Sequence, residues 1–150
     1  MKTGIDCIGV STSFYCHDEK GRWLLHKRSE KCRDERGMWD SGGGKVERGL
    51  TLEENALKEI REEYCCNAQI LEQLPAITLL RKLPGDILTH WIIVPFILLI
   101  DNNSKKDVKI GDSEKMTELG WFTFNNLPQP LHSGFLKTTQ LYKNIFEKYR

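Results

Sequence analysis

The chain has 150 residues, of which 39% are hydrophobic and 29% are charged, a composition that fits one globular domain over residues 1–150 and excludes a disordered chain. Its 22 Lys and Arg residues against 21 Asp and Glu leave a formal net charge of +1, so we expect no stable DNA binding. The longest apolar run covers residues 91–100, and a membrane span needs about 20 residues. The N-terminus also lacks the apolar core of a signal peptide. We therefore expect a cytoplasmic protein that does not enter membranes.

The first half of the chain predicts a hairpin, a charged loop, a glycine run and a helix. β-Branched and aromatic residues predict a strand over residues 5–16 and its partner over residues 22–27. Residues 29–37 are charged and predict a loop. The glycines of residues 41–44 predict irregular structure. Thr51 with Glu54 forms a capping box, which predicts a helix over residues 51–64 that stops at Asn67.

The second half predicts strands and a C-terminal helix. Strands are expected over residues 76–82 and 87–100, with Pro95 at an edge or a bulge. A polar loop over residues 102–115, with a short strand near Val108, then precedes a strand over residues 119–124. A helix is expected over residues 129–150, with four apolar side chains facing inward: Leu136, Leu141, Ile145 and Phe146. This order predicts an α+β fold, an α/β/α sandwich with a mixed, curved sheet between helices.

The five cysteines do not suggest a disulfide framework. Their number is odd and no pair has CxxC spacing, which favours free, mostly buried thiols. A redox or metal module built on Cys65 and Cys66 is the alternative, but adjacent side chains on a helix point apart and do not easily share a tetrahedral site.

The helix over residues 51–64 carries the chemistry. Glu59, Glu62 and Glu63 are three and four residues apart and share an arc that differs from the apolar face. Clustered carboxylates suit Mg²⁺ or Mn²⁺, and a glycine loop just before the helix allows close approach of backbone carbonyls. The alternative is a solvated acidic helix face.

The segment GGGKVERGLTLEENALKEIREEYCC, residues 42–66, resembles the Nudix box. The members of the pattern that match in register are Gly44, Glu59, Ile60, Glu62 and Glu63. Four positions depart from it, namely Leu50, Lys58, Cys65 and Cys66, and none of the four is a metal-binding carboxylate of the pattern.

The resemblance implies an enzyme that hydrolyses a diphosphate linkage in a nucleoside diphosphate joined to another group X, with water attacking phosphorus and Mg²⁺ as cofactor (Mn²⁺ being the alternative). It implies that Glu62 and Glu63 bind the metal together with the Gly43 carbonyl. Glu59 binds a further ion or acts as the base, so Glu59 and Glu62 are the catalytic candidates. Glu114 is the expected additional metal ligand from a downstream loop, with Asp112 and Glu118 as rivals.

Three further side chains are candidates for substrate binding. Arg28 and Lys45 are expected to contact phosphates, because a guanidinium grips a phosphate bidentately and Lys45 follows the glycines. For both, ordinary surface residues are the alternative. Trp39 is a candidate for stacking on the nucleobase or, alternatively, a core residue.

The resemblance leaves the group X open. The short chain is similar to the MutT-like group, which predicts a (d)NTP or an oxidised (d)NTP as the nucleotide substrate. ADP-ribose, a nucleotide sugar or a capped RNA end are alternatives. A non-catalytic, nucleotide-binding regulatory module on the same fold is another. The protein is expected to be a monomer or a homodimer.

Overall fold

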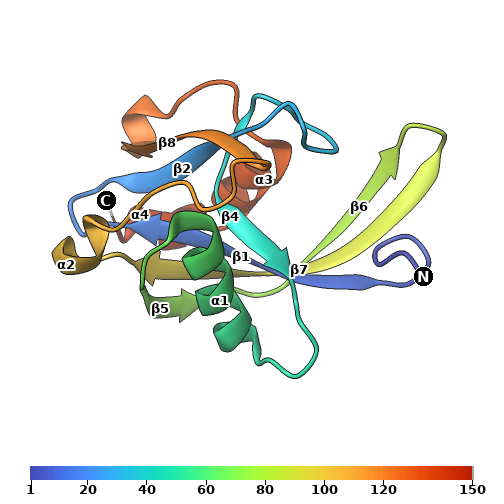
Figure 1. Cartoon of the computed structure of the whole chain (residues 1–150), viewed down its shortest axis with the longest axis horizontal. Coiled ribbons are helices and arrows are strands. Elements are labelled where there is room, and N and C mark those ends of the chain that lie inside the picture. Colours follow the sequence, from blue (N-terminus) through green and yellow to red (C-terminus); the bar gives the residue numbers. More distant parts are fainter. Residues whose placement is uncertain (150) are drawn as a thin grey trace.

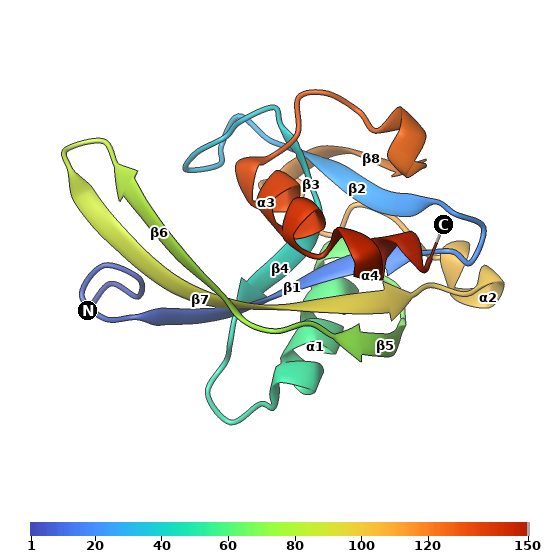
Figure 2. The ribbon, with the colours of Figure 1, turned by 180° about the vertical axis from the view of Figure 1, so that it is seen from behind.

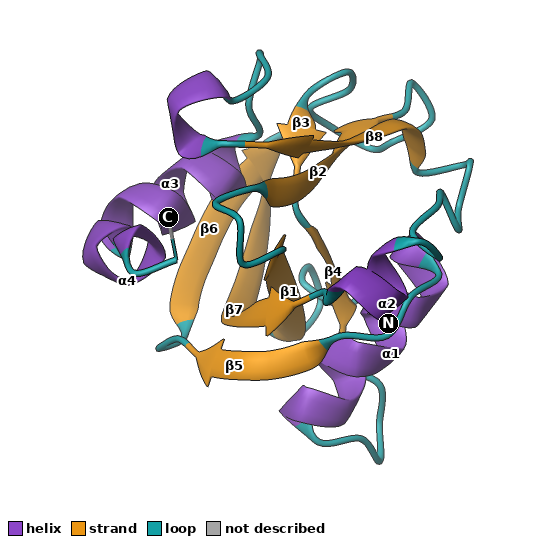
Figure 3. Cartoon of the chain, turned by 90° about the vertical axis from the view of Figure 1, so that its left-hand side faces the viewer, coloured by secondary structure: helices purple, strands orange, loops and turns teal. Residues whose placement is uncertain are grey.

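Eight strands form one mixed sheet, and helices cover both of its faces in the computed structural model, which describes residues 1–149 (Figures 1 and 3). The strands are β1 (Gly9–His17), β2 (Trp23–Arg28), β3 (Trp39–Asp40), β4 (Gly42–Lys45), β5 (Gln69–Gln73), β6 (Ile77–Leu83), β7 (Ile87–Leu99) and β8 (Met116–Phe122). The helices are α1 (Leu52–Tyr64), α2 (Asn102–Lys105), α3 (Ser133–Leu141) and α4 (Lys143–Glu147), with a 3-10 turn η1 (Phe124–Asn126).

Strand β1 lies at the centre of the sheet and divides one of its edges between two neighbours. Along its other edge it pairs in parallel with β7, from Gly9 to His17. On the divided edge, the N-terminal half of β1 pairs with β4, whereas its C-terminal end pairs with β2 only at Trp23 and Leu24. Beyond that point β2 continues with β3 and β8 as partners. The sheet is therefore mixed, as predicted, and it splits between β2 and β4.

The two faces of the sheet bury separate apolar clusters. Phe14 of β1 belongs to the cluster beneath α1, together with Ile60 and Tyr64 of that helix. Its neighbour Tyr15 points to the opposite face and packs with Phe135 and other side chains of the C-terminal helices. Figure 3 shows the strands between α1 and α2 on one side and α3 and α4 on the other. The predicted α/β/α sandwich is confirmed.

Helix α1 covers the predicted residues, but its left-handed cap comes earlier than predicted. The Thr51 side chain accepts from the Glu54 N–H, and the Glu54 carboxylate accepts from the Thr51 N–H, which completes the capping box. Cys65, rather than Asn67, takes the left-handed conformation with φ of 58°. The carbonyls of Glu63 and Tyr64 accept from the N–H groups of residues 111 and 109. This crossing segment satisfies the end of the helix, which offsets a conformational cost of about 1 kcal/mol.

The glycine run also differs from the prediction. Residues 41–44 were expected to be irregular, yet Gly42–Lys45 forms strand β4 and pairs with residues 11–14 of β1. Pro95 lies inside the long strand β7, where its carbonyl accepts from the Leu74 N–H at 2.9 Å. A strand residue directs its N–H and C=O to the same side, so the missing N–H of Pro95 falls at the break between β5 and β6.

The chain after α1 departs from the predicted elements at several points. The short strand near Val108 is absent from the described residues, and α2 lies in that region instead. Strand β5 was not predicted, and β8 begins at Met116 rather than at residue 119. The C-terminal helix is divided into α3 and α4, with Arg150 outside the described residues. Leu136 and Leu141 are exposed rather than buried, whereas Phe146 is buried as predicted.

The hairpin of β6 and β7 extends away from the body of the molecule, beside the N-terminal segment (Figure 2). Among residues 1–149, no helix has both the length and the apolar character that crossing a membrane requires.

Candidate active site

A cleft of about 650 Å³ opens where β2 leaves β1. The glycines of β4 and Glu63 of α1 line one end of it, and Ile77, Leu79, Trp91 and Ile93 of the β6–β7 hairpin line an apolar wall. Basic side chains from several elements also line it, namely Arg28, Lys31, Arg33, Lys45, Arg81, Lys115 and Lys137. The cleft therefore joins an acidic end, an apolar wall and a set of cations.

The glycines of β4 allow two carboxylates of α1 to approach the strand. A Cβ atom on Gly44 would lie 2.3 Å from the carboxyl carbon of Glu59, and one on Gly42 would lie 2.6 Å from an oxygen of Glu63. The Gly43 N–H points to the same helix, and its nitrogen lies 3.3 Å from Oε2 of Glu63. Because a strand residue directs its N–H and C=O to one side, the Gly43 carbonyl also faces away from β1.

Glu59 and Glu63 are buried without enough positive charge to balance them. Glu63 is only 4% exposed, and burial raises its pKa to about 8. Burial also raises the pKa of Glu59, against the opposing charge of Lys58 3.9 Å away. No ion pair involves Glu63 within residues 1–149. Two buried carboxylates beside an open glycine strand fit a hard divalent cation, which would remove the cost of burying their charge.

Glu62 lies apart from these two carboxylates. Its side chain is 56% exposed and its carboxylate contacts Nζ of Lys58 at 2.7 Å. Lys58 also contacts Glu47, in the loop before α1, at 3.2 Å. Glu59 and Glu63 turn toward β4, whereas Glu62 is exposed and pairs with Lys58, whose Nζ also lies 3.9 Å from Glu59. A joint metal-binding role for the three carboxylates stays a prediction.

Of the other predicted residues, Arg28, Lys45 and Glu114 line the cleft. Arg28 ends β2 and contacts the carboxylates of Asp34 at 3.0 Å and Asp40 at 3.8 Å. Lys45 is exposed at the end of β4. The Glu114 carboxylate pairs with Lys31 at 2.9 Å and not with α1. The structure thus brings Arg28, Lys45 and Glu114 to the cleft, with the Glu114 carboxylate paired with Lys31.

Trp39 does not line the cleft. Its ring packs edge-on against Phe122 with centroids 5.2 Å apart, next to the core of α3 and α4. This is the core alternative, so the substrate-stacking prediction for Trp39 finds no support in the geometry. Trp91, which no sequence signal separates from a core residue, lines the cleft instead. Gly4 and Gly9 leave room for its ring, since a Cβ on either would lie less than 2.5 Å from it.

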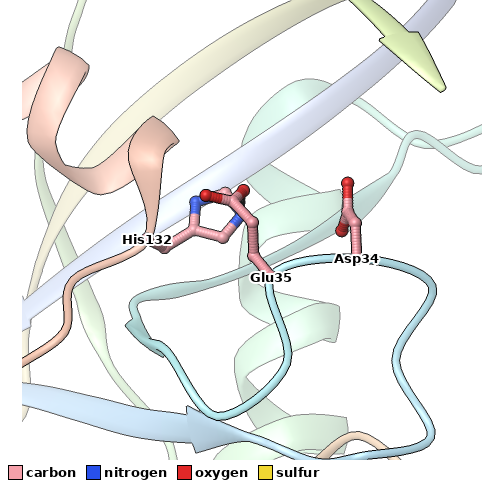
Figure 4. A group of neighbouring side chains, drawn as sticks. All are labelled: Asp34, Glu35 and His132. Atoms are coloured by element: carbon pink, nitrogen blue, oxygen red, sulfur yellow. Dashed lines mark ion pairs between the residues drawn. The ribbon is translucent and has the colours of Figure 1, made fainter. Parts of the chain in front are cut away.

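A cluster of Asp34, Glu35 and His132, whose ligand atoms lie within 4.8 Å of one another, was not predicted (Figure 4). Glu35 lies against His132, with Oε2 at 2.6 Å from Nε2. Arg81 of β6 contacts both Asp34 and Glu35, at 3.2 and 2.9 Å. Together with the contact of Arg28 to Asp34, two guanidinium groups face the two carboxylates, so the cluster is an ion network that ties the loop after β2 to β6 and α3. In the sequence, only the charged composition of residues 29–37 pointed to this cluster.

His26, to which sequence reasoning assigned no role, is buried and lines the cleft. Its Nδ1 is 2.8 Å from the hydroxyl oxygen of Tyr64, and both side chains are buried. Burial and the charge of Arg28 lower the pKa of His26 to about 3, so the imidazole is neutral at physiological pH. The alternation of side chains along β2 could have indicated that His26 is buried, because it places His26 on the same face of the sheet as the core residue Leu24.

Comparison with protein families matches a NUDIX domain to residues 8–142 of the chain. The resemblance found in the sequence motif is thereby confirmed. No curated protein sequence matches the chain.

Solved structures share its fold. A MutT NUDIX hydrolase from Burkholderia pseudomallei has a TM-score of 0.71 and 24% identity, over 90% of this chain and 98% of its own. A MutT protein from Methanosarcina mazei Go1 has a TM-score of 0.65 and 23% identity, over 95% and 92%. The NUDIX domain of Shewanella oneidensis NrtR, complexed with ADP ribose, has a TM-score of 0.70 and 19% identity, over 100% and 91%.

Proposed function

Because the chain belongs to the NUDIX domain family, as a pyrophosphohydrolase of that type, we propose that it hydrolyses a diphosphate linkage in a (d)NTP or an oxidised (d)NTP, using Mg²⁺. The observation that carries this proposal is the pair of buried carboxylates, Glu59 and Glu63, set against the glycine strand at one end of a cleft with many cations.

Glu63, Glu59 and the Gly43 carbonyl are the groups that would hold the cation. Glu62 would join them once its carboxylate leaves Lys58, which is a low-cost change because exposed ion pairs contribute at most about 1 kcal/mol. When bound, Mg²⁺ supplies charge neutralisation of the phosphoryl oxygens and lowers the pKa of a bound water.

The remaining groups bind and orient the substrate. Arg28, Lys45 and Lys115 provide positive charge along the path of the phosphates. The apolar wall of Trp91, Leu79 and Ile93 offers a surface on which a flat nucleobase can pack. Glu59 has an alternative role: if Glu63 and the Gly43 carbonyl hold the cation without it, Glu59, whose pKa is raised by burial, would accept the proton of the attacking water.

ADP-ribose is the second candidate substrate. The NrtR relative carries ADP ribose, and in this chain the lining of the cleft extends to Lys137 and Thr138 of α3. That extension offers space for a group beyond the diphosphate. A nucleotide sugar would use the same space.

The test is product release over a panel of dNTPs, oxidised dGTP, ADP-ribose, nucleotide sugars and capped RNA, with Mg²⁺ and then Mn²⁺. We expect one class to be turned over and Glu63→Gln to lower that turnover by at least about 100-fold. Glu62→Gln tests whether the Glu62 carboxylate joins the groups that hold the cation, and a large loss of turnover supports that role. Glu53→Gln, on the exposed first turn of the same helix, is the matched control and should retain activity.

Metal binding with no turnover of any nucleotide would contradict a hydrolase of these substrates and favour the non-catalytic binding module. Equal turnover by Glu63→Gln and the unmodified protein would contradict the assigned metal site.

A further inference from the structure

Buried hydrogen bonding determines which ring nitrogen of His26 carries its proton. The Tyr64 hydroxyl is fully buried, and its single hydrogen has one acceptor within reach among residues 1–149, Nδ1 of His26 at 2.8 Å. If Nδ1 carried the proton and donated it, the phenolic hydrogen would be left unpaired in the core, at a cost of about 1–3 kcal/mol. The Tyr64 O–H therefore donates to Nδ1, and Nε2 carries the proton of the neutral ring.

The Nε2–H group has no protein acceptor. His26 is 6% exposed and lines the cleft, and no described residue lies within hydrogen-bond distance of Nε2. Asp40 is directly opposite His26 in the β2–β3 ladder, but its carboxylate is engaged by the Ser41 N–H and lies near Arg28 and His132. Nε2 of His26 is not among the fully buried, unpartnered side-chain atoms of residues 1–149, which are Ser13 Oγ, His17 Nε2 and Trp23 Nε1. This donor is therefore open to the cleft, where it can meet an acceptor on a ligand.

The surroundings of His26 select an anion. Arg28 and Lys115 are close enough for their charges to act on the imidazole, and both line the cleft with it. Glu63, at the acidic end, lines the same cleft. An anionic oxygen placed between the carboxylate end and these two cations is well positioned to accept a hydrogen bond from Nε2–H.

We propose that His26 is a substrate-binding residue that donates its Nε2–H to an oxygen of the substrate's diphosphate, with Tyr64 as the positioning residue that fixes the donor tautomer. This inference rests on the proposed function for the identity of the anion. The donor is neutral, so it contributes a directed hydrogen bond without adding positive charge next to the metal-binding carboxylates.

The test uses inorganic pyrophosphate as the probe, so that it does not depend on turnover. Nitrogen NMR of the histidine-labelled protein should show a protonated Nε2 and an unprotonated Nδ1 for His26. Pyrophosphate should move the Hε2 resonance downfield. Tyr64→Phe should populate the second tautomer, because it removes the one donor to Nδ1 that residues 1–149 provide.

Calorimetry with pyrophosphate measures the contribution to binding. His26→Leu alone leaves the Tyr64 hydroxyl unpaired, so the main variant is His26→Leu with Tyr64→Phe, which removes both partners. We expect pyrophosphate binding to weaken by about tenfold or more, and His26→Gln, which restores an N–H donor, to recover part of the loss. His90→Leu, a half-buried histidine of β7 outside the cleft, is the control.

The outcomes separate the two proposals. Unchanged pyrophosphate affinity in the double variant, an unmoved Hε2 resonance, or no binding to the unmodified protein overturns the role of His26. Pyrophosphate binding that depends on His26 in a protein that turns over no nucleotide supports that role while contradicting the hydrolase.

Discussion

Glu63→Gln should change how the stability of the metal-free protein depends on pH. Burial raises the pKa of Glu63 from 4.5 to about 8, so the folded protein holds a proton that the unfolded chain releases above pH 4.5. Stability therefore falls as pH rises from about 4.5 to about 8. At about 1.4 kcal/mol per pKa unit, the upper limit of this loss is about 5 kcal/mol. A glutamine has no proton to lose, so the variant should lack this decline.

The assay is urea unfolding of both proteins between pH 5 and pH 9 in the presence of a chelator. We expect similar stability near pH 5 and a variant that is more stable by several kcal/mol near pH 9. With saturating Mg²⁺ at high pH, the unmodified protein should become more stable than the variant, because only the ionised Glu63 binds the cation strongly. Because Glu62 is exposed, the stability of the Glu62→Gln variant should depend on pH in the same way as that of the unmodified protein. If the free energy of unfolding of Glu63→Gln followed the same pH dependence as that of the unmodified protein, Glu63 would not be an uncompensated buried carboxylate.

Three further predictions concern stability and the glycine strand. Gly43→Ala should lower the free energy of unfolding by about 1–3 kcal/mol in urea titrations, because its Cβ would lie 2.4 Å from a backbone oxygen of Thr12. Gly44→Ala should mainly reduce kcat, because its Cβ meets only the flexible end of Glu59; equal loss of stability in both variants would contradict this distinction. Asp18→Asn should lower the free energy of unfolding near pH 7 by up to about 2 kcal/mol. Burial raises the pKa of Asp18, but hydrogen bonds, led by that from Lys105, outweigh it and bring the pKa to about 2. That loss should disappear as pH falls through 2, and a thermal melt at two pH values measures it.

Much of the site was predictable because its determinants are local. The capping box and the spacing of Glu59, Glu62 and Glu63 depend on helix periodicity alone, and both are present in α1. The glycines before the helix have a physical role that the pattern also indicates, since side chains there would displace Glu59 and Glu63. These features need no knowledge of the rest of the chain.

The predictions that failed concern contacts between distant segments. The glycine run became strand β4 because β1 offered it a free edge, and Cys65 ended α1 because residues 109–111 cross there. Trp39 packs beside the core and Trp91 lines the cleft, and no local sequence pattern distinguishes the two tryptophans. Which one faces the cleft depends on β7 lying beside β1.

The sequence by itself determined the helix, its carboxylates, the sandwich and the family, because periodicity, capping and motif spacing are properties of neighbouring residues. Only the tertiary structure decided that Lys58 holds Glu62 outward, that Lys31 holds Glu114, and that Tyr64 orients His26 toward the cleft. In each case the side chain's direction is set by a partner or a competing charge, and for Glu114 and His26 that partner lies far away along the chain.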